Sequence, residues 1–412
     1  MSWPIRTISE ITTSLNARRV PVKAADRAKR PGPFPYYGAS GIVDWVDDFI
    51  YEGTYLLVSE DGENLRSRNT PIAFLARGRY WVNNHAHILD EKEPGILQYL
   101  GWALNHIDVS AYITGAAQPK LNKRTLNQIA LPIPPVAERL AINATLGALD
   151  DKIELNRRIA GTLEEMARAL YRSWFVDFDP VRARAAGLAP AHMDAATAAL
   201  FPDRFGVDGL PDGWVEGSLG SIAALDPEKW SSKSNPGILR YVDLAGVKRG
   251  VIGQVVDYTW SEAPSRARKV LRAGDTIVGT VRPGNNSFAF ISDEGLTGST
   301  GFAHLRPMRQ HDRTVLYLAA TDAENIAALT HAADGAAYPA VRPAVVADSL
   351  LLIAPETVRI AFEHIAGPLI DRAEAAKRES RTLAALRDAL LPKLMSGELT
   401  VREAESRVGE LV

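Results

Sequence analysis

The chain carries the same short motif twice, a long way apart. Residues Gly115–Pro119 read Gly-Ala-Ala-Gln-Pro and residues Gly335–Pro339 read Gly-Ala-Ala-Tyr-Pro, at an offset of 335 − 115 = 220 positions. The register continues without a gap, because the apolar run Leu131–Pro135 matches Leu351–Pro355 and each run precedes a long helical pattern. Solenoid units repeat every ~20–50 residues, so a period of this size predicts two whole domains, each followed by a helix. Such a chain folds with internal pseudo-twofold symmetry if its halves pair.

Composition excludes several classes of protein. The 412 residues include no cysteine, which rules out disulfides, thiolate catalysis and cysteine-based metal centres. Neither a secretory signal at Met1–Arg6 nor an apolar run of the ~18–20 residues that cross a bilayer is evident, so we expect a cytoplasmic protein. The net charge of −2 gives no general attraction to nucleic acid, so a DNA-binding role requires basic residues gathered on one face.

Turn residues and periodicity divide the chain into five segments. Residues 1–135 and 213–355 hold short apolar and β-branched runs between Gly, Asn and Asp, typical of strand-rich domains. Residues 136–175 and 356–412 supply the two long helices and a C-terminal tail, and residues 176–212, rich in Pro and Gly, are predicted to form a linker with one short helix. The predicted fold class is α+β: two mixed α/β domains separated by two long coiled-coil helices, with an internal pseudo-twofold repeat.

The two long helices carry matching apolar seams. In the first, apolar residues alternate steps of four and three, which is the spacing of a coiled coil, and a shift of 220 positions gives a mostly apolar set on the second. The residues expected in this helix-pair seam are Ile142, Leu146, Leu149, Ile153, Leu163, Leu170, Leu369, Leu383, Leu390 and Leu394. Alternatively, each helix packs on its own domain. Asn156 interrupts the first seam and either fixes the register through a buried partner or reaches water.

The sequence shows no catalytic site. It lacks a phosphate-binding loop, a dinucleotide fingerprint, an amino-methyltransferase motif and a nucleophile elbow. His85 and His87 could touch a ligand, although histidines at a strand end are more often structural. The acidic run Ser59–Asn64 resembles a metal loop but lacks the spacing of a calcium site, so a turn with solvated carboxylates is favoured. We predict a non-catalytic chain that binds no metal.

Both strand-rich domains carry arginine, lysine and amide side chains in loops. Arg and Lys suit guanine edges and phosphates, and Asn and Gln suit adenine, although any single one is more often a solvated surface residue. The candidate DNA-binding residues of the first domain are Lys23, Arg27, Arg66, Arg68, Asn69, Lys120, Asn122 and Lys123. Those of the second domain are Lys248, Arg249, Arg266, Arg268, Arg282, Asn285 and Asn286.

Five segments, taken in order, resemble the motifs of a known family. They are Gly115–Asn122, Leu131–Glu138, Tyr171–Pro180, Leu210–Trp214 and Leu391–Leu399. Together they resemble type I restriction-modification specificity subunits, and the resemblance covers essentially the whole chain. One departure is Gly335–Val341, which lacks the Gln, Lys and Asn of the first copy, so the two copies need not act equivalently.

The resemblance implies a DNA sequence-recognition subunit without catalysis of its own. Two target recognition domains would each read one half of a bipartite, asymmetric site in double-stranded DNA. The two long antiparallel coiled-coil helices would hold them apart. The implied partners are two methyltransferase subunits and, where they exist, restriction (motor-nuclease) subunits. S-adenosylmethionine, with ATP and Mg, is then expected on the partners and no cofactor on this chain.

Helix length is consistent with this arrangement. A helix of about 38 residues spans roughly 57 Å at ~1.5 Å per residue, which suffices to separate two domains by one DNA turn of about 34–36 Å. Two other hypotheses remain, namely a self-contained nuclease or methyltransferase and a coiled-coil scaffold whose two domains bind protein. Activity of the purified chain alone would favour the first, and the absence of sequence-specific DNA binding would favour the second.

Overall fold

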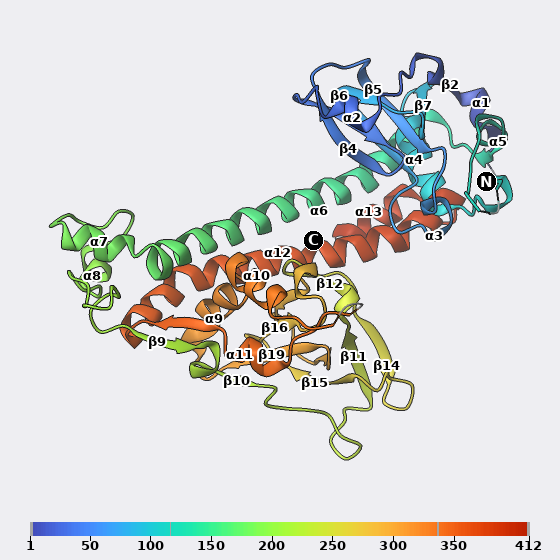
Figure 1. Cartoon of the computed structure of the whole chain (residues 1–412). Helices are drawn as coiled ribbons and strands as arrows, with labels where there is room; N and C mark the ends of the chain where they lie inside the picture. Colours follow the sequence, from blue (N-terminus) through green and yellow to red (C-terminus); the bar gives the residue numbers. More distant parts are fainter. Residues whose placement is uncertain (1–2, 116, 336–337, 410–412) are drawn as a thin grey trace. The chain divides into compact units, whose positions relative to one another are not determined.

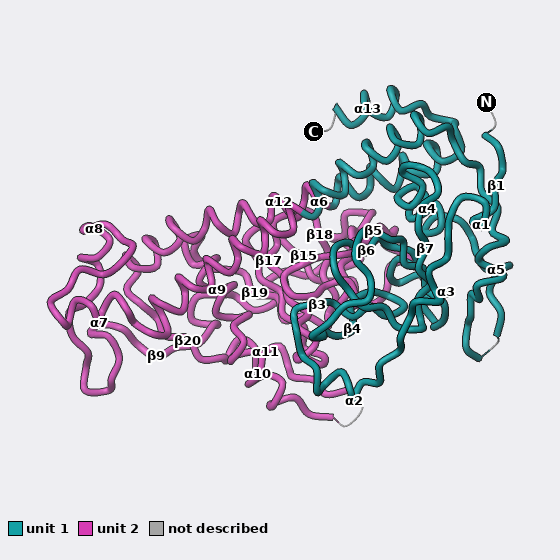
Figure 2. The backbone as a smooth tube through the Cα atoms, turned by 90° about the horizontal axis from the view of Figure 1, so that it is seen from above, with its two compact units in different colours: residues 1–154, 381–412 teal, residues 155–380 magenta. Residues whose placement is uncertain are grey.

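The computed structural model describes residues 3–115, 117–335 and 338–409. The chain divides into two compact units, residues 1–154 with 381–412 (unit 1) and residues 155–380 (unit 2), coloured teal and magenta in Figure 2. The boundary falls inside both long helices, α6 (Val136–Tyr171) and α12 (Glu356–Ser396), so each unit contains a part of each helix. None of the helices in the described part of the chain combines the length and apolar character that crossing a bilayer requires.

Unit 1 is a mixed α/β domain (Figure 1). Its shorter helices are α1 (Ile8–Ile11), α2 (Ala24–Arg27), α3 (Asn64–Ser67), α4 (Ile96–His106), α5 (Lys123–Gln128) and α13 (Val401–Gly409). Its strands are β1 (Ile5–Thr7), β2 (Thr12–Ser14), β3 (Phe34–Gly38), β4 (Gly41–Val46), β5 (Tyr51–Ser59), β6 (Ala73–Val82), β7 (Ala86–Glu91) and β8 (Ala130–Pro132). One sheet has the strand order β2-β7-β5-β6-β3-β4, and β1 pairs with β8.

Strand β5 places its side chains in two different cores. Leu56 and Val58 are fully buried in the core that α4 and the long helices close, whereas Leu57 lies in a second cluster with Tyr51 and Tyr80. Successive side chains of a strand point to opposite faces, so a strand covered on both faces reads as a continuous apolar run. This explains why residues 54–58 show no alternation of apolar and polar types.

Unit 2 is also a mixed α/β domain. Its shorter helices are α7 (Asp179–Ala185), α8 (Ala195–Ala198), α9 (Arg313–Ala320), α10 (Ala323–His331) and α11 (Pro343–Ala347). Its strands are β9 (Val215–Ser218), β10 (Ala223–Leu225), β11 (Ile238–Val242), β12 (Val247–Lys248), β13 (Val251–Ile252), β14 (Val256–Thr259), β15 (Ala267–Leu271), β16 (Thr276–Gly279), β17 (Phe288–Phe290), β18 (Leu296–Ser299), β19 (Phe302–Pro307) and β20 (Leu350–Ile353). The strand orders are β10-β19-β16-β17 and β14-β11-β18-β15, with the pairs β12-β13 and β20-β9.

The repeat in the sequence is also a repeat of topology. The antiparallel order β10-β19-β16-β17 reproduces β2-β7-β5-β6, and the pair β20-β9 reproduces β8-β1. The offset of 335 − 115 = 220 positions carries the start of α5 onto α11, of β8 onto β20 and of α6 onto α12. The motif therefore marks the same place in each unit, directly before the segment that leads into the long helix.

Helices α6 and α12 pack antiparallel within each unit. In unit 1, apolar residues of the helix-pair seam are buried together: Ile142, Leu146, Leu149 and Ile153 from α6, and Leu383, Leu390 and Leu394 from α12. Arg387 Nη1 of α12 donates to Asp150 Oδ1 of α6 over 2.6 Å. In unit 2, Ala160 packs with Ala373 and Ala376, and Leu163 is half-buried against them. Leu170 and Leu369 are half-buried against the main core of unit 2.

Asn156 has a buried partner in this helix pair. Its side chain is fully buried, and Nδ2 donates to Glu379 Oε2 of α12 over 2.9 Å. The alternative in which Asn156 reaches water is therefore wrong. Because a polar pair inside an apolar seam is satisfied in one alignment only, Asn156 and Glu379 favour this register of the two helices.

The predicted fold class of two mixed α/β domains with two long packed helices is confirmed, with local differences. The segment 176–212 holds two short helices, α7 and α8, where one was expected. Residues Arg172–Val176 form a π-helical turn at the end of α6, whose Trp174 and Phe175 pack around Phe362 of α12. Residues 401–409 form α13, where a tail was expected, and Thr400 with Glu403 makes its capping box.

Removing a buried side chain of the seam tests the helix pair. Leu146→Ala should lower the free energy of unfolding by about 2–5 kcal/mol, because it leaves a cavity in a closed core. The matched control on the same helix is Leu140→Ala, whose side chain is 45% exposed and whose loss should cost about 0.5 kcal/mol. Urea unfolding of the full chain measures both, and equal losses would contradict the packing.

Candidate nucleic-acid interface

In unit 1 the C-terminal end of the Gly-Ala-Ala-Gln-Pro motif packs against the loop that follows β5. Leu121 N donates to Glu60 O over 2.8 Å and Gly62 N to Pro119 O over 3.1 Å, while Thr114 and Lys120 exchange two backbone bonds of 2.8 Å each. Gly115 turns the chain with φ +86°, and a Cβ there would lie 2.3 Å from the Gln118 carbonyl oxygen. Only glycine therefore fits the first position of the motif.

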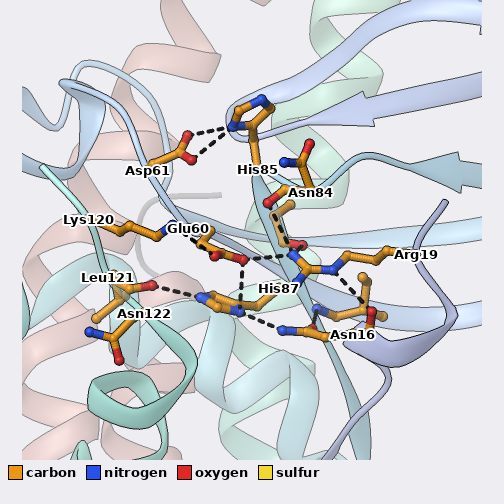
Figure 3. A network of polar contacts seen from close by, with 12 residues as sticks. Asn16, Arg19, Glu60, Asp61, Asn84, His85, His87, Lys120, Leu121 and Asn122 are labelled. Atoms are coloured by element: carbon orange, nitrogen blue, oxygen red, sulfur yellow. Dashed lines mark hydrogen bonds and ion pairs between the residues drawn. The ribbon is translucent and has the colours of Figure 1, made fainter. Parts of the chain in front are cut away.

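A buried polar network lies beneath these two loops (Figure 3). Glu60 pairs with Arg19 over 2.7 Å and with Lys120 over 3.5 Å. His87, 1% exposed, contacts the Leu121 carbonyl oxygen through Nε2 over 2.7 Å and the Asn16 amide through Nδ1 over 2.8 Å. The network connects β7 and the end of β5 to residues 120–122, so it fixes the position of the motif's C-terminal end.

The network holds Glu60 ionised and His87 neutral. Burial alone would raise the pKa of Glu60, but the Arg19 hydrogen bond and the nearby positive charges more than offset it, so that pKa lies below its usual value. Burial lowers the pKa of His87, and this effect outweighs its contacts with Leu121 and Glu60. A neutral ring with the proton on Nε2 donates to the Leu121 carbonyl and accepts from Asn16, which matches the observed partners.

The acidic run after β5 is paired with cationic and histidine side chains. Glu60 and Asp61 have side chains 14% and 16% exposed, and Asp61 lies 2.8 Å from His85 Nδ1. The predicted turn with solvated carboxylates is therefore wrong for these two residues, because the loops that flank them supply partners the sequence pattern does not show. Within the described residues, no group of three or more His, Asp or Glu side chains is arranged to hold a metal ion.

The structure gathers some of the candidate DNA-binding residues of unit 1 around the motif. Lys120 and Lys123 are exposed, Asn122 caps α5 by accepting from Thr125 N, and Arg66 donates to the Gly115 carbonyl oxygen over 2.8 Å. Four others lie elsewhere: Lys23 and Arg27 at α2, and Arg68 and Asn69 after α3.

Two of these outlying arginines have internal partners. Arg27 pairs with Asp44 over 2.7 Å and lies over the Tyr36 ring. Arg68 donates to the carbonyl oxygens of Leu104 and Ile107 at the end of α4, and burial lowers its pKa. Both arginines therefore hold parts of the domain together.

Unit 2 repeats the same loop packing with different side chains. Arg282 N donates to Pro339 O over 2.7 Å and Val341 N to Thr280 O over 2.9 Å, which are the equivalents of the Gly62 and Leu121 bonds. The Arg282 guanidinium lies 4.9 Å from the centroid of the Tyr338 ring, and Tyr338 is 72% exposed. Sequence reasoning missed Tyr338, although its replacement of Gln118 in the repeat was the available signal.

A hairpin brings further candidate residues close to the loop that contains Arg282. Strands β12 and β13 are joined by Arg249 and Gly250, and Arg249 N donates to Asn286 O over 2.8 Å. The residues of unit 2 that the structure brings together are Lys248, Arg249, Arg282, Asn285 and Asn286. Arg266 and Arg268 lie apart from them, on β15 and the segment before it, where Arg266 pairs with Asp243 and Arg268 covers the Trp260 ring.

The most buried His–Asp pair in unit 2 has no access to solvent. His304 and Asp275 have side chains 0% and 1% exposed and are 2.6 Å apart, and Arg306 also pairs with Asp275. Burial would raise the pKa of Asp275, but hydrogen bonds from His304 and Arg306 lower it below its usual value. The pair joins strands inside the domain and cannot reach a substrate.

A family model described as the type I restriction modification DNA specificity domain matches residues 2–165. The MjaIX type I restriction enzyme specificity subunit of Methanocaldococcus jannaschii is 21% identical over 84% of this chain and 80% of its own length. The chain is therefore similar to type I restriction-modification specificity subunits, and the family model itself matches residues 2–165. Its fold matches the crystal structure of a type I restriction-modification S subunit from M. genitalium, with a TM-score of 0.63, 15% identity and 96% coverage of both chains.

Other relatives of this specificity-subunit family match over a shorter stretch. A putative type I restriction enzyme specificity subunit of Haemophilus influenzae is 35% identical over 35% of this chain and 36% of its own length. The HindI specificity subunit of the same organism is 32% identical over 34% of this chain and 27% of its own length. The matched part thus spans about a third of the length of these two family members.

The neutral state of His87 predicts how stability depends on pH. Its pKa is lower in the folded chain than the ordinary value of about 6.5, so the unfolded chain binds the proton more readily. The free energy of unfolding should hold above that ordinary value and decline as the pH falls from 6.5 toward 5. Stopping at pH 5 keeps carboxyl groups such as Glu60, whose pKa is lowered, outside the window.

Urea unfolding of the full chain between pH 5 and 8 measures this dependence. His87→Gln should make the decline shallower, whereas His106→Gln, at the exposed end of α4, should leave it as in the wild type. An unchanged slope in His87→Gln would show that the buried histidine is not the titrating group.

Proposed function

We propose that this chain is the DNA sequence-recognition subunit of a type I restriction-modification complex. Residues 1–135 and 213–355 would be its two target recognition domains, each reading one half of a bipartite, asymmetric site. The observation that carries the proposal is the repeated packing of two loops, at Gly62 and Pro119 in unit 1 and at Arg282 and Pro339 in unit 2, with basic side chains around both. The backbone packing of the two loops is the same in both domains, but the side chains on these loops differ.

The charges at these loops suit a duplex. Lys120, Lys123, Lys248 and Arg249 are exposed beside amide side chains, although the chain as a whole has a net charge of −2. Phosphate contacts supply orientation and most of the nonspecific affinity, whereas base edges in the grooves supply specificity. A local concentration of cations and amides in an otherwise acidic protein is what a recognition subunit requires.

In this proposal the chain itself recognises DNA and its partners perform catalysis. Two methyltransferase subunits, with S-adenosylmethionine, would dock on the segments 136–175 and 356–412, and restriction subunits with ATP and Mg would join them where present. The family match at residues 2–165 and the repeat support this division, because two like segments offer two like surfaces to identical partners. An enzyme that modifies a base must extract it from the stack, so the recognition subunit would grip the flanking nucleotides.

Exchange of one domain tests whether each domain recognises its half-site independently of the other. Replacing residues 1–135 with the corresponding domain of another family member should change one half-site and leave the other unchanged. Sequencing duplexes selected from a randomised pool by the full chain, alone and with a type I methyltransferase subunit, shows both halves at once. A reciprocal exchange of residues 213–355 is the control and should change the other half. Changes in both halves after one exchange would disprove modularity, and no selection by the wild type would favour the protein-binding scaffold.

Removing two cations tests the contact with phosphates. The double variant Lys120→Gln, Lys123→Gln should reduce the slope of log K against log salt by about 1.8 if each lysine neutralises one phosphate. The control is Arg402→Gln, an exposed arginine of unit 1 on α13, which should leave the slope unchanged. Affinity titrations at several salt concentrations measure it, and an unchanged slope in the double variant would remove these lysines from the interface.

A further inference from the structure

The hairpin that carries Lys248 and Arg249 has a strained turn. Its two central residues, Arg249 and Gly250, have φ of +46° and +79°, so both are left-handed, as a type I′ turn requires. Glycine adopts this conformation freely, whereas arginine does so at a cost and only where its surroundings enforce it. The turn therefore needs contacts that hold its backbone in place.

Part of that support comes from the sheet. Arg249 N donates to Asn286 O and Gly250 N to Phe288 O, each over 2.8 Å. These bonds engage both amide groups of the turn, and a long helix supplies a further bond, to the Gly250 carbonyl oxygen. Lys377 Nζ of α12 donates to this oxygen over 2.7 Å.

Lys377 also joins the two long helices. Its Nζ pairs with Glu164 of α6 and, over 2.7 Å, with Glu374 of α12, and the Lys377 and Glu374 side chains are 9% and 5% exposed. Burial would lower the pKa of Lys377, but the two carboxylates more than offset it and raise the pKa, so the side chain remains charged. One buried ammonium group thus connects α6, α12 and the turn.

The fit around Gly250 is close. A Cβ at this position would lie 2.8 Å from the Tyr317 hydroxyl, 3.3 Å from Glu164 Oε1 and 3.4 Å from Lys377 Nζ. Tyr317, on α9, is fully buried. The turn therefore packs tightly against Tyr317 of α9, Glu164 of α6 and Lys377 of α12 within unit 2. Its backbone cannot shift without moving these side chains.

We propose that Lys377 is a positioning residue for DNA recognition: it fixes the backbone of the β12–β13 turn against the helix pair, and the turn presents Lys248 and Arg249 to one half-site. The inference rests on the proposed function and deepens it. Lys377 does not contact DNA. Its loss should therefore impair reading by unit 2 while reading by unit 1 is kept.

Two substitutions at one helix provide a matched test. Lys377→Met removes an interhelical ion pair together with the bond to the turn. Arg387→Met, ten residues further along α12, removes the ion pair with Asp150 of α6, and the Arg387 hydrogen bonds in the described part of the chain go to Asp150 and Asp388 only. Both variants weaken the helix pair, but only the first releases the recognition turn.

The measurement is selection of bound duplexes from a randomised pool by each full-length variant, followed by affinity for the selected site. Lys377→Met should lose sequence preference in the half-site assigned to residues 213–355, keep the other, and bind the complete site at least tenfold more weakly. Arg387→Met should keep both preferences. Lys377→Arg, which retains a cationic donor, should restore part of the lost preference.

Gly250→Ala provides a second test of the proposal if the Lys377→Met variant fails to fold. It disturbs the turn while every ion pair remains, and it should show the same loss confined to one half-site. Retention of that preference in both Lys377→Met and Gly250→Ala would overturn the inference, as would equal loss in both half-sites for Lys377→Met and Arg387→Met. A wild type that selects no bipartite site would overturn the proposed function itself, a result distinct from either of these.

Discussion

The antiparallel packing of α6 on α12 is the interaction on which both units depend. Neither strand-rich region closes its hydrophobic core by itself. In unit 1, Leu146 of α6 and Leu390 of α12 complete the core beneath α4, and in unit 2 Trp174 and Phe362 do the same beside α9. Each core thus takes residues from two helices that lie far apart in the sequence. This is why the compact units divide the long helices instead of following the predicted segments.

Periodic features of the fold could be predicted from the sequence, because they follow from local rules. The 3-4 spacing of apolar residues predicts two long helices that pack together, and the repeated motif marks the same loop packing in both halves. Helix α13 could also be predicted from the sequence, since Thr400 and Glu403 form a recognisable capping box. The π-helical turn after α6 had no such signal, because it results from tertiary packing of Trp174 and Phe175.

The candidate interface was less accessible to sequence reasoning, because a charged residue in a loop does not reveal its partner. The sequence pattern groups Arg27 and Arg68 with Lys120 and Lys123. In the structure the two arginines have internal acceptors, whereas both lysines are exposed, although Lys120 also pairs with Glu60. Conversely, the sequence pattern predicts a solvated Glu60 in an acidic turn, whereas in the structure Glu60 is the centre of a buried network with Arg19 and His87. Pairings of this kind depend on which loops meet, and only the fold determines that.

Anchoring of the β12–β13 turn through a carbonyl oxygen has a consequence for how such a protein diversifies. The bond from Lys377 to the Gly250 oxygen is made to the main chain, so it does not depend on the side chains at positions 248 and 249. Mutations at those two positions can therefore explore new base preferences while the anchor, the helix pair and the fold stay as they are. Because the anchor is a main-chain bond, the DNA sequence that the protein recognises can change during evolution while the fold is retained.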